Sequence, residues 1–503
     1  MDAVINGAHL VFSLDVLLVI ALSALFGIFV GAIPGLTATM AVALLVPITF
    51  YMDPTPAIAA IVTTSAMAIF SGDIPGTYLN IPGTPASAAY VSESYQLAQK
   101  GKAREALGTN LICSVFGGIF GTIVLIIVAQ SLAEVALQFS AFEYFWLAIL
   151  GLTCSIFISF GSKTKAFLSL LFGIMLSTVG LDMMSGAPRF TFGIPDLMGG
   201  VNFIPVMIGM FALSELMSYY GSSSEKKTIA AISKDSIFKN APHNLMKYKK
   251  NVLRGSTIGT FIGALPGAGA DIAAWISYAM GKSMSKDRKA YGTGNIEGIV
   301  DASSANNSGI SGAWVPALVF GIPGDSITAI VIGVLYMKGM NPGPTIFMDE
   351  SGLIYALFIV FIIANLMMLP IGYMAIRLSK IFILTPSKIL MPIILCFCIV
   401  GAFAINNSII DIWLMLIVGG IAFVLSRNDF PMAPAILGLV LGGTVENNFM
   451  SAMMRTDGNF LSFFSRPISA TLGVIVILIW VSPLIISCVK RIRGMRIEDT
   501  VSR

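Results

Sequence analysis

The chain has 503 residues, of which 56% are hydrophobic and only 11% are charged, whereas about a quarter of the residues in an ordinary soluble domain are charged. It lacks the polar side chains that would cover a soluble fold of this size, and it is too apolar for a disordered chain. The net charge of +4 is too small to indicate nucleic-acid binding. The composition therefore predicts a multi-pass protein of a lipid bilayer.

Apolar runs long enough to span a bilayer recur along the chain. They predict an all-α polytopic membrane protein with about 10–12 transmembrane segments. The first run begins near Val11 and continues into more membrane sequence without the small-residue cleavage site of a signal peptide. Three regions, 15–50, 57–98 and 252–340, are apolar but broken by Pro-Gly pairs and polar clusters. The uninterrupted runs lie near 107–130, 141–160, 166–183, 201–220, 352–376, 389–405, 409–425, 432–450 and 468–488.

The longest hydrophilic stretch, 221–250, contains seven lysines against two acidic residues. Because cytoplasmic loops of membrane proteins carry an excess of Lys and Arg, this loop is predicted to be cytoplasmic. The same rule places the basic segment 282–289 and the tail after Lys490 inside, and 184–199 outside. The lysines therefore indicate membrane topology.

Short motifs recur in the two halves of the chain. Gly31-Ala32-Ile33-Pro34-Gly35 recurs as Gly263-Ala264-Leu265-Pro266-Gly267, and Ile81-Pro82-Gly83 recurs as Ile322-Pro323-Gly324. Ser71-Gly72 recurs as Ser311-Gly312, and Lys100-Gly101 recurs as Lys338-Gly339. In chain order these matches have offsets of 232, 240 to 241 and 238 residues, and such ordered matches at nearly one offset indicate a duplicated unit. The predicted divisions are a first repeat at 1–220 (motifs 27–50 and 71–89), the basic loop 221–250, a second repeat at 251–425 (motifs 263–282 and 301–328), and C-terminal membrane segments with a cytoplasmic tail at 426–503.

The charges beside these motifs change sides between the copies. After the first Pro-Gly motif, copy one has only Asp53, whereas copy two has the basic segment 282–289. After the second motif, the basic residues lie in copy one. Equivalent loops are therefore predicted on opposite membrane faces, so the repeats are inverted. The segments 15–50 and 252–280 are expected to be re-entrant helical hairpins that enter from opposite sides.

Pro-Gly pairs at corresponding positions of both halves predict broken helices. Non-helical backbone at membrane depth is tolerated only where protein or a water-filled cavity satisfies its polar groups, and paired broken helices mark transport sites. Hydroxyl and amide side chains beside the breaks, with the N–H groups of helices that start there, can bind an anion without a basic residue. The candidate substrate-binding residues are Pro34, Gly35, Thr37, Asn80, Pro82, Gly83, Thr84, Ser87, Pro266, Gly267, Asn306, Asn307, Pro323, Gly324 and Ser326.

Five carboxylates lie in the broken segments, at Asp73, Asp271, Glu297, Asp301 and Asp325. Intramembrane carboxylates are costly and usually functional. Asp271 and Asp301 are predicted to lie deepest and to couple transport to a cation, either Na⁺ or H⁺. The sequence leaves the choice of ion open, and it predicts no cofactor and no metal other than Na⁺.

No enzymatic activity is predicted. A membrane enzyme would need a nucleophile with a base, or a metal cluster, at membrane depth. His9 and His243 are poorly placed for this, and the five cysteines lie in apolar runs without metal-ligand spacing. A passive anion channel stays open as an alternative, although two broken hairpins with intramembrane acids favour a carrier with alternating access.

The stretch from Gly27 to Pro47, with its G-x-x-x-G-x-x-P-G-L pattern, resembles the large membrane subunit of the tripartite tricarboxylate transporters. The likeness extends over nearly the whole chain, from about residue 15 to 480. In one departure, this chain has Thr37 where the family normally carries Gly after its first P-G-L. Four further runs are similar to the family: Gly72 to Thr77 with Ile81 to Ala89, Gly263 to Ala270, Asn306-Asn307-Ser308, and Gly321-Ile322-Pro323-Gly324-Asp325.

The resemblance implies a secondary transporter of the inner (cytoplasmic) membrane of a bacterium or archaeon, which takes up small di- or tricarboxylates by means of an ion gradient. It also implies two partners, a small membrane subunit of about four helices and an extracytoplasmic solute-binding protein that delivers the substrate. Consistent with uptake without ATP, the chain has no G-x-x-x-x-G-K-[ST] phosphate-binding loop. A homodimer stays an open alternative, and the sequence does not name the carboxylate.

Overall fold

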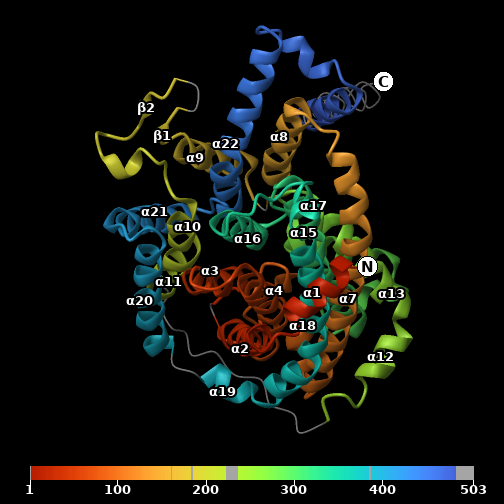
Figure 1. Cartoon of the computed structure of the whole chain (residues 1–503). Coiled ribbons are helices and arrows are strands. Elements are labelled where there is room, and N and C mark those ends of the chain that lie inside the picture. Colours follow the sequence, from red (N-terminus) through yellow and green to blue (C-terminus); the bar gives the residue numbers. More distant parts are fainter. Residues whose placement is uncertain are drawn as a thin grey trace, which may run out of the picture.

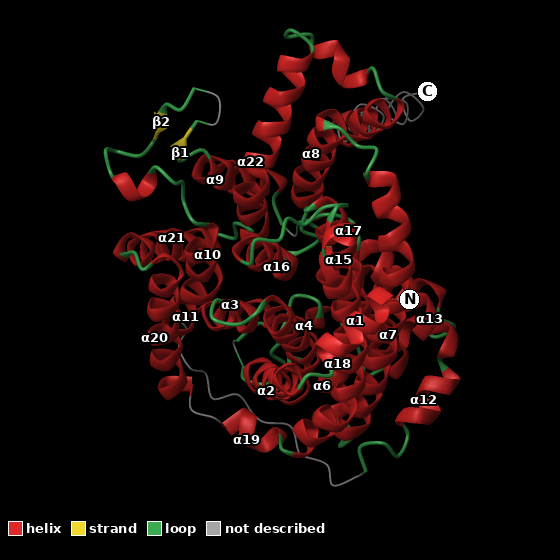
Figure 2. Ribbon diagram, viewed as in Figure 1, coloured by secondary structure: helices red, strands yellow, loops and turns green. Residues whose placement is uncertain are grey.

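The computed structural model is an assembly of α-helices with one short antiparallel β-hairpin in the part of the chain that it describes (Figure 2). The hairpin pairs Gly180 with Arg189. The predicted all-α polytopic class is confirmed. Gly35, most of the predicted cytoplasmic loop (222–235) and the tail beyond 482 lie outside the described residues, which are 2–34, 36–159, 161–182, 185–221, 236–384 and 387–482.

The first half of the chain contains long helices and, between them, short helices separated by breaks. Its elements are α1 (Asp2–Val11), α2 (Leu14–Gly31), α3 (Ala38–Thr49), α4 (Pro54–Ser71), α5 (Asp73–Leu79), η1 (Ser87–Ala89), α6 (Val91–Gln99), α7 (Ala103–Ala136), α8 (Ala141–Ile158), α9 (Lys163–Ser177), β1 (Gly180–Leu181), β2 (Pro188–Arg189), η2 (Pro195–Leu197), α10 (Phe203–Met207), the π-helical turn η3 (Ile208–Leu213) and α11 (Ser214–Gly221).

The second half follows the same alternation. Its elements are α12 (Ala241–Lys247), α13 (Lys249–Gly263), α14 (Gly269–Met284), η4 (Arg288–Ala290), α15 (Ile296–Phe320), α16 (Ser326–Met337), α17 (Ile346–Asp349), α18 (Ser351–Arg377), α19 (Ser379–Leu384), α20 (Ser387–Asn406), α21 (Ile409–Arg427), α22 (Met432–Arg455) and η5 (Phe460–Phe464), with a further apolar helix at Pro467–Ser482.

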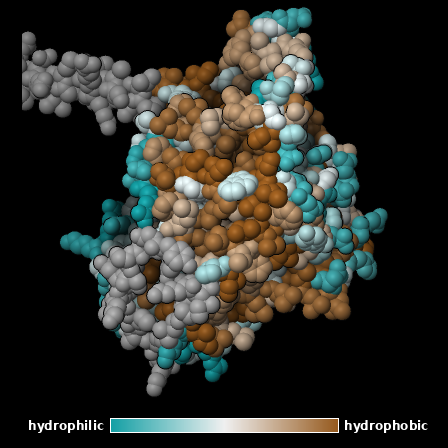
Figure 3. Space-filling model, turned by 90° about the vertical axis from the view of Figure 1, so that its left-hand side faces the viewer, coloured by the Kyte–Doolittle hydropathy of each residue, from teal (hydrophilic) through white to brown (hydrophobic). Residues whose placement is uncertain are grey.

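Several helices have the length and composition of membrane spans. Among the described residues, Leu14–Gly31, Pro54–Leu79, Ala103–Ala136, Ser351–Arg377 and Ile409–Arg427 qualify, and shorter apolar helices accompany them. Large apolar side chains remain exposed on the outer helices, for example on α2 and α21. Figure 3 shows a broad, largely hydrophobic face of the molecule. Such a face suits contact with lipid, since a soluble protein seldom exposes so large an apolar surface.

Small residues bring α2 against α4 and α13 against α15. A Cβ atom at Gly27 would meet Thr64 of α4, and one at Gly259 would meet Ala305 of α15. Gly31 and Gly263 make the next such contacts in each pair, with Ala68 and Gly309 respectively. Close backbone approach through Gly and Ala is the usual basis of helix association in membranes. The two helix pairs therefore pack in the same way.

These contacts recur at the offsets of the sequence repeat. Gly27 and Gly259 are 232 residues apart, while their partners Thr64 and Ala305 are 241 apart. The larger arrangement also matches, because α4 packs on α18 and α15 packs on α7 (Figure 1). The matched contacts agree with a duplicated unit. The opposite orientation of the copies and their boundaries at 1–220, 251–425 and 426–503 stay predictions.

The α13–α15 contact gives a stability test. Gly259→Val places methyl groups against Ser308 and Ala305 of α15, and overpacking of this kind costs about 1–3 kcal/mol. We expect the purified variant to have a lower Tm in detergent. Gly420→Val in α21 is the matched control, because a Cβ atom there meets nothing within 4 Å. An equal Tm for the two variants would contradict the packing argument.

Candidate functional site

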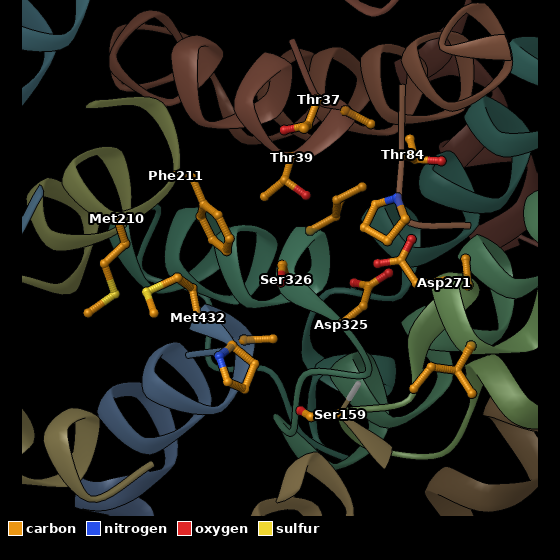
Figure 4. A pocket seen from close by; sticks show the side chains of 18 of the residues that line it. Thr37, Thr39, Thr84, Ser159, Met210, Phe211, Asp271, Asp325, Ser326 and Met432 are labelled. Carbon is orange, nitrogen blue, oxygen red and sulfur yellow. The ribbon is translucent and has the colours of Figure 1, made fainter. Parts of the chain in front are cut away.

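A cavity of about 320 Å³ lies where the interrupted segments of both halves meet (Figure 4). The N-terminal ends of α3, α14, α16 and α22 border it, together with the 80–86 connection and the η3–α11 segment. Helix N-termini carry N–H groups without intrahelical partners and a partial positive charge, and the side chains of Thr37 and Asp325 cap one N–H group each in α3 and α16. The lining residues include Thr37, Thr39, Thr84, Pro85, Ser159, Met210, Phe211, Ser214, Glu215, Gly267, Asp271, Asp325, Ser326, Ser426, Pro431 and Met432.

The two main breaks have the same local geometry. The helix before each break ends on a left-handed residue, Asn80 at φ 58° and Gly321 at φ 66°, and these positions are 241 residues apart. A left-handed residue at this position ends a helix and turns the chain away from its axis. The segments that follow supply Thr84 and Ser326 to the cavity.

After each break, two residues three positions apart exchange a pair of hydrogen bonds between side chain and backbone N–H. In copy one, Thr84 N donates to Ser87 Oγ (3.1 Å) and Ser87 N donates to Thr84 Oγ1 (3.1 Å). In copy two, Thr328 N donates to Asp325 Oδ1 (2.8 Å) and Asp325 N donates to Thr328 Oγ1 (2.8 Å). The second pair is a capping box, which satisfies two helix-terminal groups at once. Both pairs hold a cavity-lining side chain in place.

Two pairs of repeat-related positions in the cavity carry hydroxyl groups in copy one and carboxylates in copy two. Thr39 and Asp271 occupy equivalent positions 232 residues apart, and Thr84 and Asp325 occupy equivalent positions 241 apart. Asp271 and Asp325 interact electrostatically, and Figure 4 shows both carboxylates beside the cavity. With Glu215, the described lining has three carboxylates and no Lys, Arg or His.

Hydrogen bonds from the 80–86 connection to α14 join the two halves at this cavity, and Trp275 Nε1 donates one of them to the carbonyl oxygen of Pro85 (3.1 Å). The N–H of Ala86, in the connection after α5, donates to Asp271 Oδ1 at the start of α14 (3.2 Å). Gly269 lies so close to Asp325 that a Cβ atom there would come within 2.6 Å of the Asp325 Cβ. The first turns of α14 and α16 and the 80–86 connection therefore form one contact unit.

The structure brings only some of the predicted substrate-binding residues to the cavity. Thr37, Thr84, Gly267 and Ser326 line it, as does the predicted coupling residue Asp271. Thr37 is also the N-cap of α3, where it accepts from Met40 N (3.2 Å). Gly35 lies outside the described residues. The other predicted residues, which are Pro34, Asn80, Pro82, Gly83, Ser87, Pro266, Asn306, Asn307, Pro323 and Gly324, belong to the breaks or to α15 and do not border the cavity.

Asp301 lies elsewhere, in a salt bridge. Arg254 Nη2 is 2.6 Å from Asp301 Oδ1, and Asn251 Nδ2 donates to Asp301 Oδ2 (2.9 Å). The Asp301 side chain is fully buried and does not border the cavity. Its charge is balanced within the protein. A role for Asp301 in cation coupling stays a prediction. In this structure both of its carboxylate oxygens already bind Arg254 or Asn251.

Sequence reasoning missed the contribution of α11, α22 and η3 to the cavity. Phe211, Glu215 and Met432 lie outside the Pro-Gly motifs. Two signals could have pointed to them: Pro431, which starts α22, and the glutamate at 215 within an apolar run. The π-helical turn that presents Phe211 has no such sequence signal, although turns of this kind are frequent at functional sites.

Comparison with known proteins decides the family. The sequence model of the tripartite tricarboxylate transporter TctA family matches residues 17–437. The chain belongs to this family. It is 33% identical over 448 residues, 89% of each chain, to an "Uncharacterized 52.8 kDa protein in TAR-I ttuC' 3'region" of Agrobacterium vitis. It is 31% identical over 230 residues, 45% of this chain and 95% of the relative, to an "Uncharacterized protein in TAR-II ttuC' 3'region" of the same organism. No solved structure matches.

The family result confirms the resemblance inferred from the motifs. It implies that the chain is the large subunit of a tripartite tricarboxylate transporter and that further subunits, including a binding protein, accompany it. The apolar helices agree with a multi-pass membrane protein.

The cavity can be tested by cysteine accessibility in a variant without native cysteines. Thr39→Cys and Ser326→Cys line the cavity and should react with a small water-soluble thiol reagent. Asn307→Cys, at a position 2% exposed within α15, should react far more slowly. Labelling rates followed by mass spectrometry give the comparison. Equal rates at the three positions would refute the assigned lining.

Proposed function

We propose that this chain is the membrane permease of a three-component carrier that takes up small di- or tricarboxylates under an ion gradient. The observation that carries the proposal is the cavity at the meeting point of two equivalent broken segments, bordered by four helix N-termini. Paired interrupted helices around a central cavity suit a substrate site with alternating access. Family membership supports the transport class.

The hydroxyl side of the cavity is the proposed carboxylate site. Thr37, Thr39 and Thr84 offer donors there, and α3 begins at Ala38. Helix N-termini and hydroxyl groups bind anions without a basic side chain. Met210, Phe211 and Met432 add apolar surface to the lining, across the cavity from Asp271 and Asp325 (Figure 4). That combination fits a short carbon chain with carboxylate groups.

The acidic side of the cavity is the proposed cation site. An anion entering beside Asp271 and Asp325 would be repelled unless a cation or proton accompanied it. Each uncompensated negative charge also opposes uptake by about 2.3 kcal/mol per 100 mV of inside-negative potential. Na⁺ or H⁺ at Asp271 would remove both penalties. The same requirement favours a coupled carrier over a passive channel.

The proposal includes the remaining members of the system. A small membrane subunit would cover part of the exposed apolar surface, a solute-binding protein would deliver the carboxylate from outside, and the assembly would lie in the inner (cytoplasmic) membrane. A homodimer is an alternative use of the same surface. Because the family is one of transporters, we propose no enzymatic activity.

Uptake by proteoliposomes containing the chain and its small partner tests the proposal. Accumulation of a labelled carboxylate should require an imposed Na⁺ or H⁺ gradient. Asp271→Asn should raise the cation concentration that gives half-maximal uptake by about 10- to 100-fold, because bonds to a charged group contribute about 1.5–3 kcal/mol. Asp411→Asn is the control, since Asp411 of α21 is buried, accepts from Asn406 at the end of α20, and does not border the cavity. Equal carboxylate uptake with and without an imposed ion gradient would favour a channel.

Topology is tested with single cysteines at exposed, described positions. Ser185 lies beside the β-hairpin and Ser283 lies at the end of α14. The charge distribution predicts Ser185 outside and Ser283 inside. An impermeant thiol reagent applied to intact cells should label only Ser185→Cys, and inverted vesicles should give the reverse result. Labelling of both positions from one side would contradict the predicted arrangement.

A further inference from the structure

A second carboxylate lies buried outside the cavity. Asp73, at the start of α5, is 4% exposed within the apolar span Pro54–Leu79. Tyr90 Oη and Asn110 Nδ2 both donate to its Oδ2 atom, each at 2.7 Å. Ser114 Oγ in turn donates to Asn110 Oδ1 (3.0 Å). The cluster therefore joins α5, the segment after η1, and α7.

The charge of Asp73 lacks a partner of opposite sign. Among the described residues, no Lys, Arg or His forms an ion pair with it. Two other buried acids have a basic partner: Asp301 pairs with Arg254, and Glu143 pairs with Arg466. Asp411, like Asp73, is bound by an asparagine and has no ion pair among the described residues. Glu93 instead accepts four hydrogen bonds, from Tyr278 Oη and three backbone N–H groups. Asp73 accepts only two, and a buried charge with so few partners is costly.

An acceptor oxygen without a donor completes the cluster. The side chain of Asn306 on α15 is 2% exposed, and its Oδ1 has no hydrogen-bond partner in the described structure. Its Nδ2 atom donates to Tyr90 Oη (3.5 Å), the group that binds Asp73. A half-turn of the amide exchanges its two ends and would direct Oδ1 toward Tyr90 instead. A buried acceptor left without a donor is rare in native structures. With the amide in that orientation, a cation beside Tyr90 would bind this oxygen and the Asp73 carboxylate together.

We propose that Asp73, Tyr90 and Asn306 form a Na⁺ site between α5, α7 and α15. A hard monovalent cation takes carboxylate, amide and hydroxyl oxygens, and one carboxylate balances one positive charge. Divalent cations usually need more carboxylates or several waters. The site is separate from Asp271, which borders the cavity, and from Asp301, which Arg254 neutralises.

The segment 80–90 connects this site with the cavity. Its far end supplies Tyr90 to Asp73, its middle supplies Thr84 and Pro85 to the cavity lining, and Ala86 N binds Asp271. A Na⁺ ion at Asp73 would therefore order the same segment that contacts the substrate. This consequence for coupling rests on the proposed transport function. The binding of Na⁺ itself does not, because it can be measured without a carboxylate.

Na⁺ binding to the purified full chain tests the site. In a choline chloride background, ²²Na⁺ should bind saturably, and NaCl should raise Tm more than KCl does. Asp73→Asn should weaken Na⁺ binding by about tenfold or more, because the only charged ligand is lost. Tyr90→Phe and Asn306→Ala should also weaken it. Asp411→Asn is the matched control, since it removes another 4% exposed carboxylate that an asparagine binds.

The outcomes separate this site from its alternatives. Wild-type Na⁺ affinity in Asp73→Asn protein that has the normal Tm in choline would overturn the proposal. So would Na⁺ binding lost in Asp271→Asn but retained in Asp73→Asn, or stabilisation by acid with none by Na⁺. If Asp73→Asn does not fold, Tyr90→Phe and Asn306→Ala decide. Should carboxylate uptake fail while Na⁺ binding behaves as expected, the transport function is wrong and the site stands.

Discussion

A helix that is interrupted inside a bilayer must satisfy its broken backbone without bulk water, and this constraint organises the molecule. The chain meets it by bringing its breaks together around one cavity. Asn80 and Gly321 end the helices before the breaks. After the breaks, hydrogen bonds between Thr84 and Ser87 and between Asp325 and Thr328 satisfy backbone N–H groups. The close packing of α2 on α4 and of α13 on α15 supports this arrangement, because small residues at the crossings let the helix backbones approach closely in both halves.

The function that we propose depends on where the two copies differ. Equivalent positions in the cavity carry Thr39 and Thr84 in one copy and Asp271 and Asp325 in the other. A symmetric pair of hydroxyl surfaces would bind an anion without coupling it to a cation, and a symmetric pair of acidic surfaces would repel it. Divergence of the copies at these two pairs of positions places hydroxyl groups for an anion and carboxylates for a cation in the same cavity. The duplicated backbone thus supplies the geometry, and four side chains supply the polarity.

The sequence was sufficient where a local signal marked the structure. Pro-Gly pairs located the breaks, and residues beside them, such as Thr84, Ser326 and Asp271, do border the cavity. Asn306 and Asn307 carry the same polar signal but lie within the continuous helix α15, so their direction depends on how α7, α13 and α14 pack against it. The Asp301–Arg254 pair spans 47 residues of sequence and forms only when α13 lies on α15. No local pattern encodes that contact.

The connection from Asn80 to Tyr90 suggests an order of events. Its middle borders the cavity and is tied to Asp271, while its end is tied to Asp73. Asp271 opposes an anion in the cavity while it lacks a counter-charge, since a like charge at short range in a low-dielectric site is strongly unfavourable. A cation that binds first at Asp271 removes this repulsion, and one at Asp73 fixes the connection, whereas an anion that binds first meets the repulsion in full. Cation before carboxylate is therefore the order that the charge distribution favours.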